Sequence, residues 1–255
     1  MKNSVKLEDF DKIGVVIVAQ STKTINYFEI AKRAARFIER NLNLPVTIVQ
    51  PNTNIVNLKK HNKSTEWKNL GRWEVYNQTP YELTILLDAD YLALTPTLLK
   101  FVNLTKDYQI LQKSHTSLGM MESFMGTYYR RHLWATIVMF RQTERSKMLF
   151  ELVKKIEQNW GYYSRHFQLD PYSFRNDFAF TIADLILNGY KTGINLPHSM
   201  LTIVDSIKTV RLTGNLINVK TETQNLVVAP QDLHVMDKEW LVSDDFLNFE
   251  KEYNE

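Results

Sequence analysis

Short, continuous apolar runs alternate with a segment of helical periodicity in the first part of the chain. The runs Ile13–Ala19 and Pro45–Gln50 are rich in β-branched residues and predict buried parallel strands. Between them, Tyr27–Leu42 places its apolar side chains at helical spacing, with charged residues on the opposite face. This order predicts a β-α-β unit with a right-handed crossover, which is the building block of an α/β fold.

A further apolar run, Thr84–Leu87, ends in two acidic residues, Asp88 and Asp90. Side chains two residues apart on an extended chain point to the same side. Ligands of open α/β sheets bind beyond the carboxyl ends of the strands. Two carboxylates in this position predict a site for a divalent cation that also holds phosphate. The alternative is that both residues only cap the segment that follows.

The patterns in the rest of the chain predict the elements around this strand. Residues 51–70 are expected to form a long loop over the mouth of the sheet or a mobile flap, and 115–131 a loop at the site. A hairpin with a turn at 213–215 is expected within 203–228. The other predicted elements are helices at 71–78, 92–106 with Thr95 as its cap, 143–160 with Thr143 as its cap, and 177–188, and strands at 108–112 and 134–140. We therefore expect a mixed α/β sheet with flanking helices and a less regular, β-containing C-terminal part.

The composition narrows the class of protein. The 255 residues, 44% hydrophobic and 23% charged, suit a globular domain, and no apolar run approaches the roughly 20 residues of a membrane span. Residues 1–10 mix charges without an apolar core, so no secretory signal is expected. The absence of cysteine excludes disulfides, thiolate zinc sites and cysteine nucleophiles, and it fits a cytoplasmic protein. The net charge of +3 permits phosphate or nucleic-acid partners without requiring them.

Two later segments carry candidate chemistry. In Asp232–Lys238, the imidazole of His234 could complete a magnesium or manganese shell, and Lys238 could neutralise phosphate charge on a leaving group. Near a helix start, Asp177 would stay ionised and could accept a proton or bind hydroxyl groups, with Asn176 beside it. The alternatives are a polar surface loop for the first segment and simple helix caps for the second.

Lys68 and Arg72 lie one helical turn apart, ahead of the acidic strand. Their charges suit the phosphates or base of a nucleotide, although a solvated helix face explains them equally well.

Several common catalytic motifs are missing from the sequence. There is no G-x-S-x-G elbow and no glycine-rich G-K-S/T loop, and no G-x-G-x-x-G follows the first strand. These absences disfavour a serine hydrolase, a P-loop enzyme and a dinucleotide-binding fold.

Taken as an ordered set, several blocks of the sequence resemble the GT-A-fold glycosyltransferases. The likeness is greatest to small glycosyltransferases of tailed bacteriophages, which are distantly similar to the glycogenin group, and it covers most of residues 13–240. The blocks are Val18–Gln20, Gln78–Leu92, Trp134–Phe140, Phe174–Ile182 and Leu233–Lys238.

The resemblance implies a nucleoside-diphosphate sugar donor, expected to be a UDP-sugar, held through its diphosphate by Mn²⁺ or Mg²⁺. It implies that Asp90 is the principal metal carboxylate, that Asp88 assists the metal or the ribose, and that His234 is the late metal ligand. Donor-side positions matched by the resemblance or expected at this end of the sheet are Ala19, Gln20, Lys68, Arg72, Asp88, Ala89 and Lys238.

On the acceptor side, the resemblance implies that Trp134 and Asn176 contact the acceptor and that Asp177 is the catalytic base if the reaction inverts. A single domain is expected over 1–255, with a nucleotide-binding half at about 10–110 and an acceptor half at about 111–255. The sequence departs from the family pattern twice. No glycine stands between His234 and Lys238, and residues 49–52 lack the acidic residue that many members use for the base.

The resulting hypothesis is a metal-dependent hexosyl- or pentosyltransferase, located in the host cytoplasm if phage-encoded, whose acceptor is a hydroxymethylated or glycosylated cytosine of phage DNA. A saccharide or protein hydroxyl is the alternative acceptor. A non-catalytic nucleotide- or DNA-binding module on the same scaffold is the alternative function. A nucleotidyltransferase would usually carry an N-terminal glycine-rich segment, and Gly14 is the only glycine in the N-terminal part of this chain, before Gly71. The sequence leaves the oligomeric state open.

Overall fold

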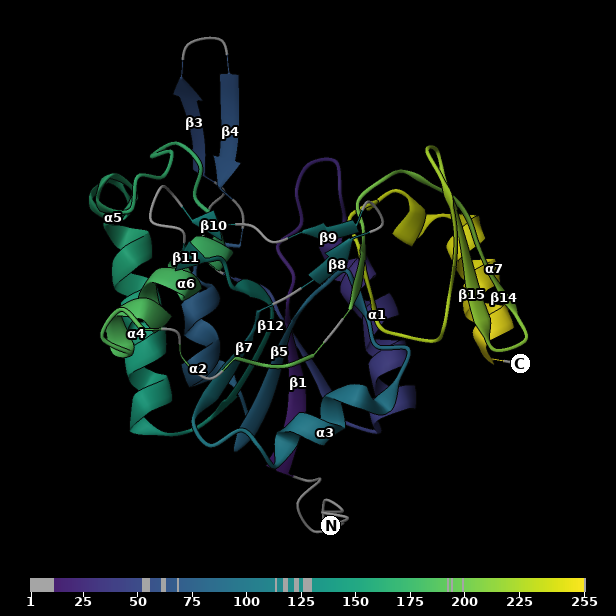
Figure 1. Cartoon of the computed structure of the whole chain (residues 1–255), viewed down its shortest axis with the longest axis horizontal. Helices are drawn as coiled ribbons and strands as arrows, with labels where there is room; N and C mark the ends of the chain where they lie inside the picture. Colours follow the sequence, from purple (N-terminus) through teal and green to yellow (C-terminus); the bar gives the residue numbers. More distant parts are fainter. Residues whose placement is uncertain are drawn as a thin grey trace.

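A five-stranded mixed sheet forms the centre of the molecule, in the order β2–β1–β5–β12–β7 (Figure 1). The strands are β1 (Ile13–Val18), β2 (Val46–Val49), β5 (Leu83–Asp88), β7 (Tyr108–Leu111) and β12 (Trp134–Arg141). β1 pairs in parallel with β2 and β5, whereas β12 runs antiparallel to both β5 and β7. The predicted mixed α/β sheet is therefore confirmed.

This arrangement comes from a computed structural model. It describes residues 12–51, 56–60, 63–67, 69–112, 114–116, 119–121, 124–125, 130–191, 193, 195–198 and 200–254. Within these ranges, no helix combines the length and the apolar character needed to cross a bilayer.

Helices cover both faces of the sheet because its strands are apolar on both sides. Val15 and Ile17 of β1 pack in one core with α1 (Tyr27–Leu42), whereas Val16 and Val18 pack in a second core with α4 (Glu144–Gln158) and α6 (Asn176–Leu187). Figure 1 shows α1 on one side of the sheet and α4 and α6 on the other. α1 spans the predicted residues, and Thr143 caps α4 as predicted, followed by α5 (Trp160–His166).

A second sheet brings distant parts of the chain together at the carboxyl end of β5. Its order is β6–β17–β13–β8–β9. The strands are β6 (Tyr91–Leu92), β17 (Leu233–Val235), β13 (Leu201–Ile203), β8 (Ser114–Thr116) and β9 (Gly119–Met121). β6 begins directly after the acidic pair, and its antiparallel partner β17 carries His234. Residues 232–235 are therefore buried, with a strand at Leu233–Val235, whereas residues 236–238 follow the strand and are more exposed.

The C-terminal part contains a three-stranded antiparallel sheet packed against the last helix. The strands β14 (Ile207–Thr213), β15 (Leu216–Thr221) and β16 (Asn225–Val228) pair in sequence order, and α7 (Asp244–Asn254) contacts β14. Gly214, with φ of 59°, lies in the first turn. The predicted hairpin is confirmed, and a third strand extends it. The short helix η4 (Trp240–Val242) precedes α7.

Three sequence predictions about elements are wrong. Instead of loops, the structure contains the hairpin of β3 (Val56–Lys60) and β4 (Lys63–Trp67), and the short strands β8 to β11, with β10 at Phe124–Met125 and β11 at Arg130–Arg131. Backbone pairing alone can form such ladders without an apolar period, which is why the side-chain pattern did not reveal them. Figure 1 shows the β3–β4 hairpin standing above the edge of the sheet where β1 and β5 end.

The helix expected at 92–106 is the third wrong prediction. Only η3 (Pro96–Leu98) and α3 (Leu99–Val102) are helical there, because residues 91–92 are extended and pair with β17. The predicted cap is confirmed, since Thr95 accepts a hydrogen bond from the N–H of Thr97. The short helix predicted at 71–78 is present as η2 (Arg72–Glu74) and α2 (Val75–Gln78).

Candidate metal centre

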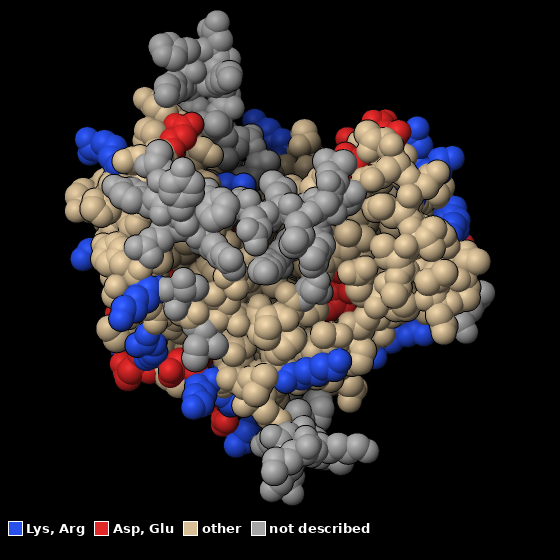
Figure 2. Space-filling model, viewed as in Figure 1, with Lys and Arg blue, Asp and Glu red and all other residues tan. Residues whose placement is uncertain are grey.

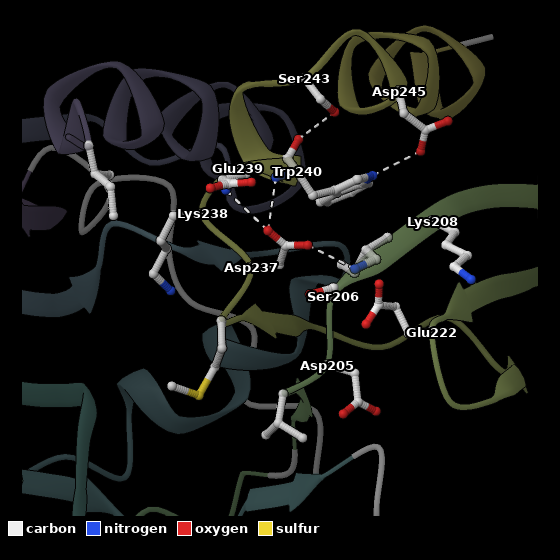
Figure 3. Close-up of a pocket in the computed structure, with 14 residues that line it drawn as sticks. Asp205, Ser206, Lys208, Glu222, Asp237, Lys238, Glu239, Trp240, Ser243 and Asp245 are labelled. Atoms are coloured by element: carbon white, nitrogen blue, oxygen red, sulfur yellow. Dashed lines mark hydrogen bonds between the residues drawn. The ribbon is translucent and has the colours of Figure 1, made fainter.

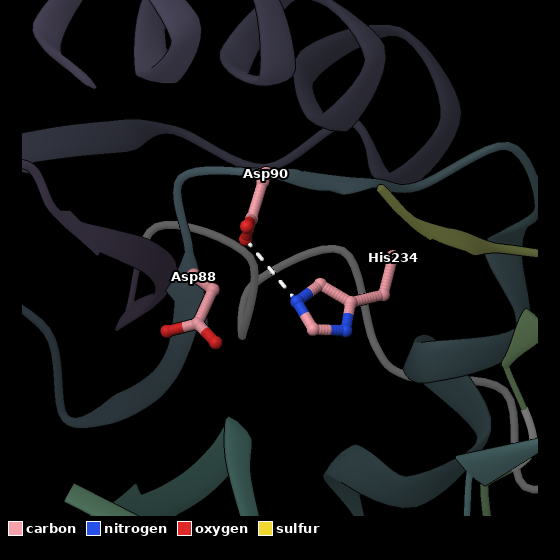
Figure 4. A group of neighbouring side chains, drawn as sticks. All are labelled: Asp88, Asp90 and His234. Atoms are coloured by element: carbon pink, nitrogen blue, oxygen red, sulfur yellow. Dashed lines mark ion pairs between the residues drawn. The ribbon is translucent and has the colours of Figure 1, made fainter. Parts of the chain in front are cut away.

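The register of β6 against β17 assembles a cluster of three potential metal ligands. β5 ends at Asp88, the chain turns through Asp90, and Tyr91 then pairs with His234. One ligand atom from each of Asp88, Asp90 and His234 lies within 4.8 Å of the others (Figure 4). Nε2 of His234 lies 3.4 Å from Oδ1 of Asp90. Carboxylate oxygens with one imidazole are a donor set that suits Mn²⁺ or Mg²⁺.

Burial makes the charges of this cluster strongly interdependent. Only 8% of Asp90 and 6% of His234 is exposed. Burial alone would raise the pKa of Asp90, but His234 and Lys238 outweigh it and hold that pKa well below its ordinary value. Burial would likewise lower the pKa of His234, and the neighbouring Asp90 raises it instead. Asp90 is therefore an anion at neutral pH, as a metal ligand must be.

Two protein cations already pair with the two carboxylates. Nζ of Lys238 donates to Oδ2 of Asp90 and, at 2.7 Å, to the carbonyl of Val235. Nη1 of Arg72 donates to Oδ1 of Asp88, and its Nη2 donates to the carbonyl of Ala135 at 2.7 Å. The predicted cations Arg72 and Lys238 thus converge on the acidic pair, and Arg72 is a buried residue and not part of a solvated helix face.

Ala135 connects the acidic pair to Asp177. The ladder between β5 and β12 begins at Ile137, so the peptide groups of Ala135 are free to bind side chains. The N–H of Ala135 donates to Oδ1 of Asp177 at 2.8 Å, and Arg175 donates to Oδ2 at 2.6 Å. Asp177, at the start of α6, is therefore held on the same side of β12 as the guanidinium of Arg72, with both its oxygens engaged.

Asn69 joins two further predicted residues. Oε1 of Gln20 accepts a hydrogen bond from the N–H of Asn69 at 2.6 Å, and the carbonyl of Asn69 accepts one from Nδ2 of Asn176 at 3.1 Å. Oδ1 of Asn176 is buried and accepts no hydrogen bond from the described residues. The end of β1 and the start of α6 are thereby fixed to the segment that carries Arg72.

The carboxylate of Glu157 holds the same segment from α4. It accepts hydrogen bonds from the N–H of Gly71 at 3.0 Å and from Nε1 of Trp73 at 3.2 Å. Burial raises the pKa of Glu157, although these two donors oppose the increase. Gly71 has φ of 78°, a conformation that favours glycine, so the turn into η2 depends on this residue.

The other predicted residues have less distinctive surroundings. Ala19, Ala89 and Trp134 are buried, and the N–H of Ala19 donates to the carbonyl of Val49 at 2.9 Å. Lys68 lies outside the described residues. The donor and acceptor roles assigned to these four residues stay predictions.

One tyrosine near the acidic pair escaped the sequence analysis. Burial, together with the charges of Asp90 and Asp88, raises the pKa of Tyr27 to about 12. Its hydroxyl therefore stays protonated at neutral pH and is able to donate a hydrogen bond. The only signal in the sequence was its position at the start of a helix that follows a central strand.

A buried polar network behind the cluster was also missed. The hydroxyl of Tyr91 donates to Oδ2 of Asp232 at 2.6 Å and lies 3.1 Å from Nε2 of His198. Oδ1 of Asp232 accepts from the N–H of Thr95 at 2.8 Å. Because Tyr91 follows Asp90 and Asp232 precedes His234 by two residues, this network fixes the two chain segments that supply metal ligands. No local pattern links these residues, which are far apart in the sequence.

A groove of about 770 Å³ opens beside Lys238 (Figure 3). Its walls are the segments Val204–Lys208 and Met236–Trp240, with Ile25, Glu222, Ser243 and Asp245. Asp237 braces the two walls by accepting hydrogen bonds from the N–H of Ile207 at 2.8 Å and from the N–H of Trp240 at 3.1 Å. The side chain of Lys238 therefore borders both the acidic cluster and an open space.

Basic side chains do not gather in one place on the face drawn in Figure 2, where Lys and Arg are scattered among neutral and acidic residues. That face gives no sign of a continuous anion-binding surface among the residues it colours.

Comparisons with known proteins identify no family. No family model and no curated protein sequence matches the chain. A glycosyltransferase involved in glycosylation of the major capsid of PBCV-1 is similar in structure, at 10% identity and a TM-score of 0.41, covering 74% of this chain and 84% of that chain. The apo form of the glycosyltransferase GlyE from Streptococcus pneumoniae TIGR4 is also similar in structure, at 10% identity and a TM-score of 0.37. The similarity covers 72% of this chain and 45% of that chain.

A third similar structure is a putative glucose-1-phosphate thymidylyltransferase from Bacillus anthracis, at 8% identity and a TM-score of 0.35, covering 74% of this chain and 87% of that chain. Similarities this low carry no inference about chemistry, which has to come from the side chains of the site.

Proposed function

We propose that the protein is a divalent-metal-dependent glycosyltransferase that moves a sugar from a nucleoside-diphosphate sugar to a hydroxyl acceptor. The observation that supports this most directly is the convergence of Asp88, Asp90 and His234 at the carboxyl end of a central strand. Ligands of open α/β sheets bind at that end, and UDP is the first nucleotide to test.

In this proposal, Asp90 and His234 hold the cation, and Asp88, fixed by Arg72, is a further ligand or binds the ribose. When bound, a divalent cation would supply positive charge that stabilises the departing nucleoside diphosphate. Lys238 brings a second positive charge to the same place. Ala19, Gln20 and Ala89, at the ends of β1 and β5, would line the nucleotide side.

On the acceptor side, Asp177 is the proposed base. The N–H of Ala135 orients its Oδ1, whereas its Oδ2 is paired with Arg175, whose side chain is 48% exposed and can exchange for an acceptor hydroxyl. Oδ1 of Asn176, which is buried and has no donor among the described residues, is chemically suited to a hydroxyl donor. Trp134 would form part of the acceptor surface.

The proposed acceptor is a hydroxymethylated or glycosylated cytosine in DNA, by the resemblance to small bacteriophage glycosyltransferases. A saccharide or protein hydroxyl is the alternative. Radiolabelled UDP-glucose and UDP-arabinose would be offered in parallel to hydroxymethylcytosine-containing DNA, unmodified DNA, oligosaccharides and a peptide mixture. Label in the modified DNA alone is expected, and label only in saccharide, peptide or water would refute the DNA acceptor.

The transferase proposal itself is tested by donor binding. Thermal unfolding would be followed with UDP- and GDP-sugars in the presence and absence of Mn²⁺, for the wild type and for Asp90→Asn. A sugar nucleotide at about 100 times its Kd stabilises by about 2.7 kcal/mol, which raises the melting temperature by several degrees. Stabilisation that requires both Mn²⁺ and Asp90 is expected. No stabilisation by any sugar nucleotide would refute the proposal.

A further inference from the structure

The two cations that neutralise the acidic pair are held very differently. The guanidinium of Arg72, whose side chain is 2% exposed, is bound to Asp88 and to the carbonyl of Ala135. Its segment is tied to Gln20 and Glu157. Because the guanidinium is buried and its segment is anchored at Asn69 and Gly71, Arg72 cannot leave Asp88 without repacking the end of the sheet.

Lys238, in contrast, has room to move. Its side chain is 13% exposed and lines the groove of about 770 Å³, and its only recorded partners among the described residues are Asp90 and the carbonyl of Val235. In Figure 3 the side chains of Lys238 and Asp237 leave their segment in different directions, with Asp237 pointing toward the segment of Ser206 and Lys208. A lysine ammonium is a compact charge on a flexible stem of four carbons, so it can change partners by rotation of its own side chain.

The position of Lys238 conflicts with metal binding by Asp90. Oδ1 of Asp90 faces His234, and Oδ2 is taken by the ammonium group of Lys238. The charges of Arg72 and Lys238 already match those of the two carboxylates, before any proton on His234 is counted. A divalent cation added to this balanced set would lie beside the Lys238 ammonium in a buried place, where like charges repel strongly.

We propose that Lys238 is a displaceable counter-ion of the metal site, which must leave Asp90 before that carboxylate can ligate a divalent cation. The inference rests on the metal site of the proposed function and goes beyond it. Lys238 would swing into the groove and become available to the phosphates of the nucleotide. The nucleotide therefore draws Lys238 away from Asp90, and metal and nucleotide each bind better in the presence of the other, as reciprocity of coupling requires.

The test measures Mn²⁺ binding without any nucleotide, by isothermal titration calorimetry and by electron paramagnetic resonance of free Mn²⁺. Lys238→Met removes the competing charge and is expected to tighten Mn²⁺ binding about ten-fold, within the usual range of coupling between two ligands. Lys208→Met is the matched control, because Lys208 lines the same groove on the opposite side from Lys238 (Figure 3). This variant is expected to leave the affinity for Mn²⁺ unchanged. Unchanged or weaker binding by Lys238→Met would overturn the inference.

Three further variants keep the test decisive. Lys238→Arg keeps the positive charge and should not tighten Mn²⁺ binding, whereas Lys238→Gln should repeat the gain if Lys238→Met does not fold, as judged by its thermal unfolding. Asp90→Asn should abolish binding in either background.

The failure of the inference is distinguishable from the failure of the proposed function. If neither the wild type nor Lys238→Met binds Mn²⁺, with or without UDP, the metal site is wrong and both proposals fall. If Mn²⁺ binds through Asp90 and Lys238→Met binds it no more tightly than the wild type, only the role of Lys238 is wrong.

Discussion

Replacing Tyr91 with phenylalanine removes one hydroxyl from the buried network that joins the two halves of the metal site. The hydroxyl donates to Asp232 at 2.6 Å and lies 3.1 Å from His198. A hydrogen bond to a buried charged group contributes about 1.5–3 kcal/mol. We therefore expect Tyr91→Phe to lower the free energy of unfolding by about 2 kcal/mol, which in a chain of this size lowers the melting temperature by roughly 4–8 °C.

Tyr91→Phe should affect metal binding as well as stability, which an ordinary buried hydrogen bond would not do. Because Tyr91 adjoins Asp90 and pairs with His234, Tyr91→Phe should also weaken Mn²⁺ binding by about ten-fold, the lower end of the range for groups that orient metal ligands. Binding would be measured by calorimetry at a temperature where the variant is fully folded.

Tyr253→Phe is the matched control for this prediction. Its hydroxyl donates to the carbonyl of Leu94 at 2.5 Å and lies 3.1 Å from Oδ1 of Asn41, and among the described residues it makes no hydrogen bond to Asp232, His198 or the metal ligands. Loss of these neutral hydrogen bonds should cost about 1 kcal/mol and leave Mn²⁺ binding unchanged. If Tyr91→Phe weakens Mn²⁺ binding no more than Tyr253→Phe does, the network does not position the metal ligands.

Three other predictions concern the cations and carboxylates around the cluster. Arg72→Met removes the buried donor of the Ala135 carbonyl and of the Asp88 carboxylate, whose side chain is 25% exposed, and should destabilise the fold by about 1–3 kcal/mol in urea unfolding. An unfolding free energy equal to that of the wild type would contradict this role of Arg72. Burial raises the pKa of Glu157, so the folded state binds its proton more tightly than the unfolded chain does. The free energy of unfolding should therefore fall as the pH rises from the ordinary pKa of 4.5 through the raised pKa. Glu157→Gln should flatten that dependence in unfolding curves taken between about pH 4 and about pH 7, and an equally steep dependence would assign it to other groups. Asp177→Asn should reduce the rate of sugar transfer by about 10²–10⁴-fold while Mn²⁺ binding stays as in the wild type, and a rate within a few-fold of the wild type would exclude Asp177 as the base.

The parts of the fold that the sequence predicts correctly are those in which neighbouring residues carry the information. β1 and α1 follow from a continuous apolar run and from helical periodicity, and Thr143 follows from the preference of threonine for helix caps. The position of Asp88 and Asp90 at the end of a buried strand is likewise predictable from neighbouring residues, because the two carboxylates directly follow the apolar run in the sequence. The hairpin β3–β4 lacks such a signal, since its strands are polar and pair through the backbone.

Pairing between distant charges is the part that local patterns could not predict. Lys68 and Arg72, read as neighbours on a helix, suggested a solvated or phosphate-binding face, yet the guanidinium of Arg72 is buried against Asp88. The helical spacing says nothing about this, because burial of Arg72 depends on β12 offering the carbonyl of Ala135 at the end of its ladder. Lys238 on Asp90 is a second pairing that only the tertiary fold creates.

The whole candidate site depends on a single register. Tyr91 lies opposite His234, and that pairing sets the imidazole beside Asp90. Because side chains alternate faces along a strand, a shift of one residue would place Leu233 or Val235 opposite Tyr91 and turn the imidazole to the other face. β6 has only two residues and could not hold this register by its backbone alone. The hydrogen bonds of Asp232 to Tyr91 and to Thr95 hold both strands together at their shared end, which explains why a carboxylate outside the group of potential metal ligands is buried there.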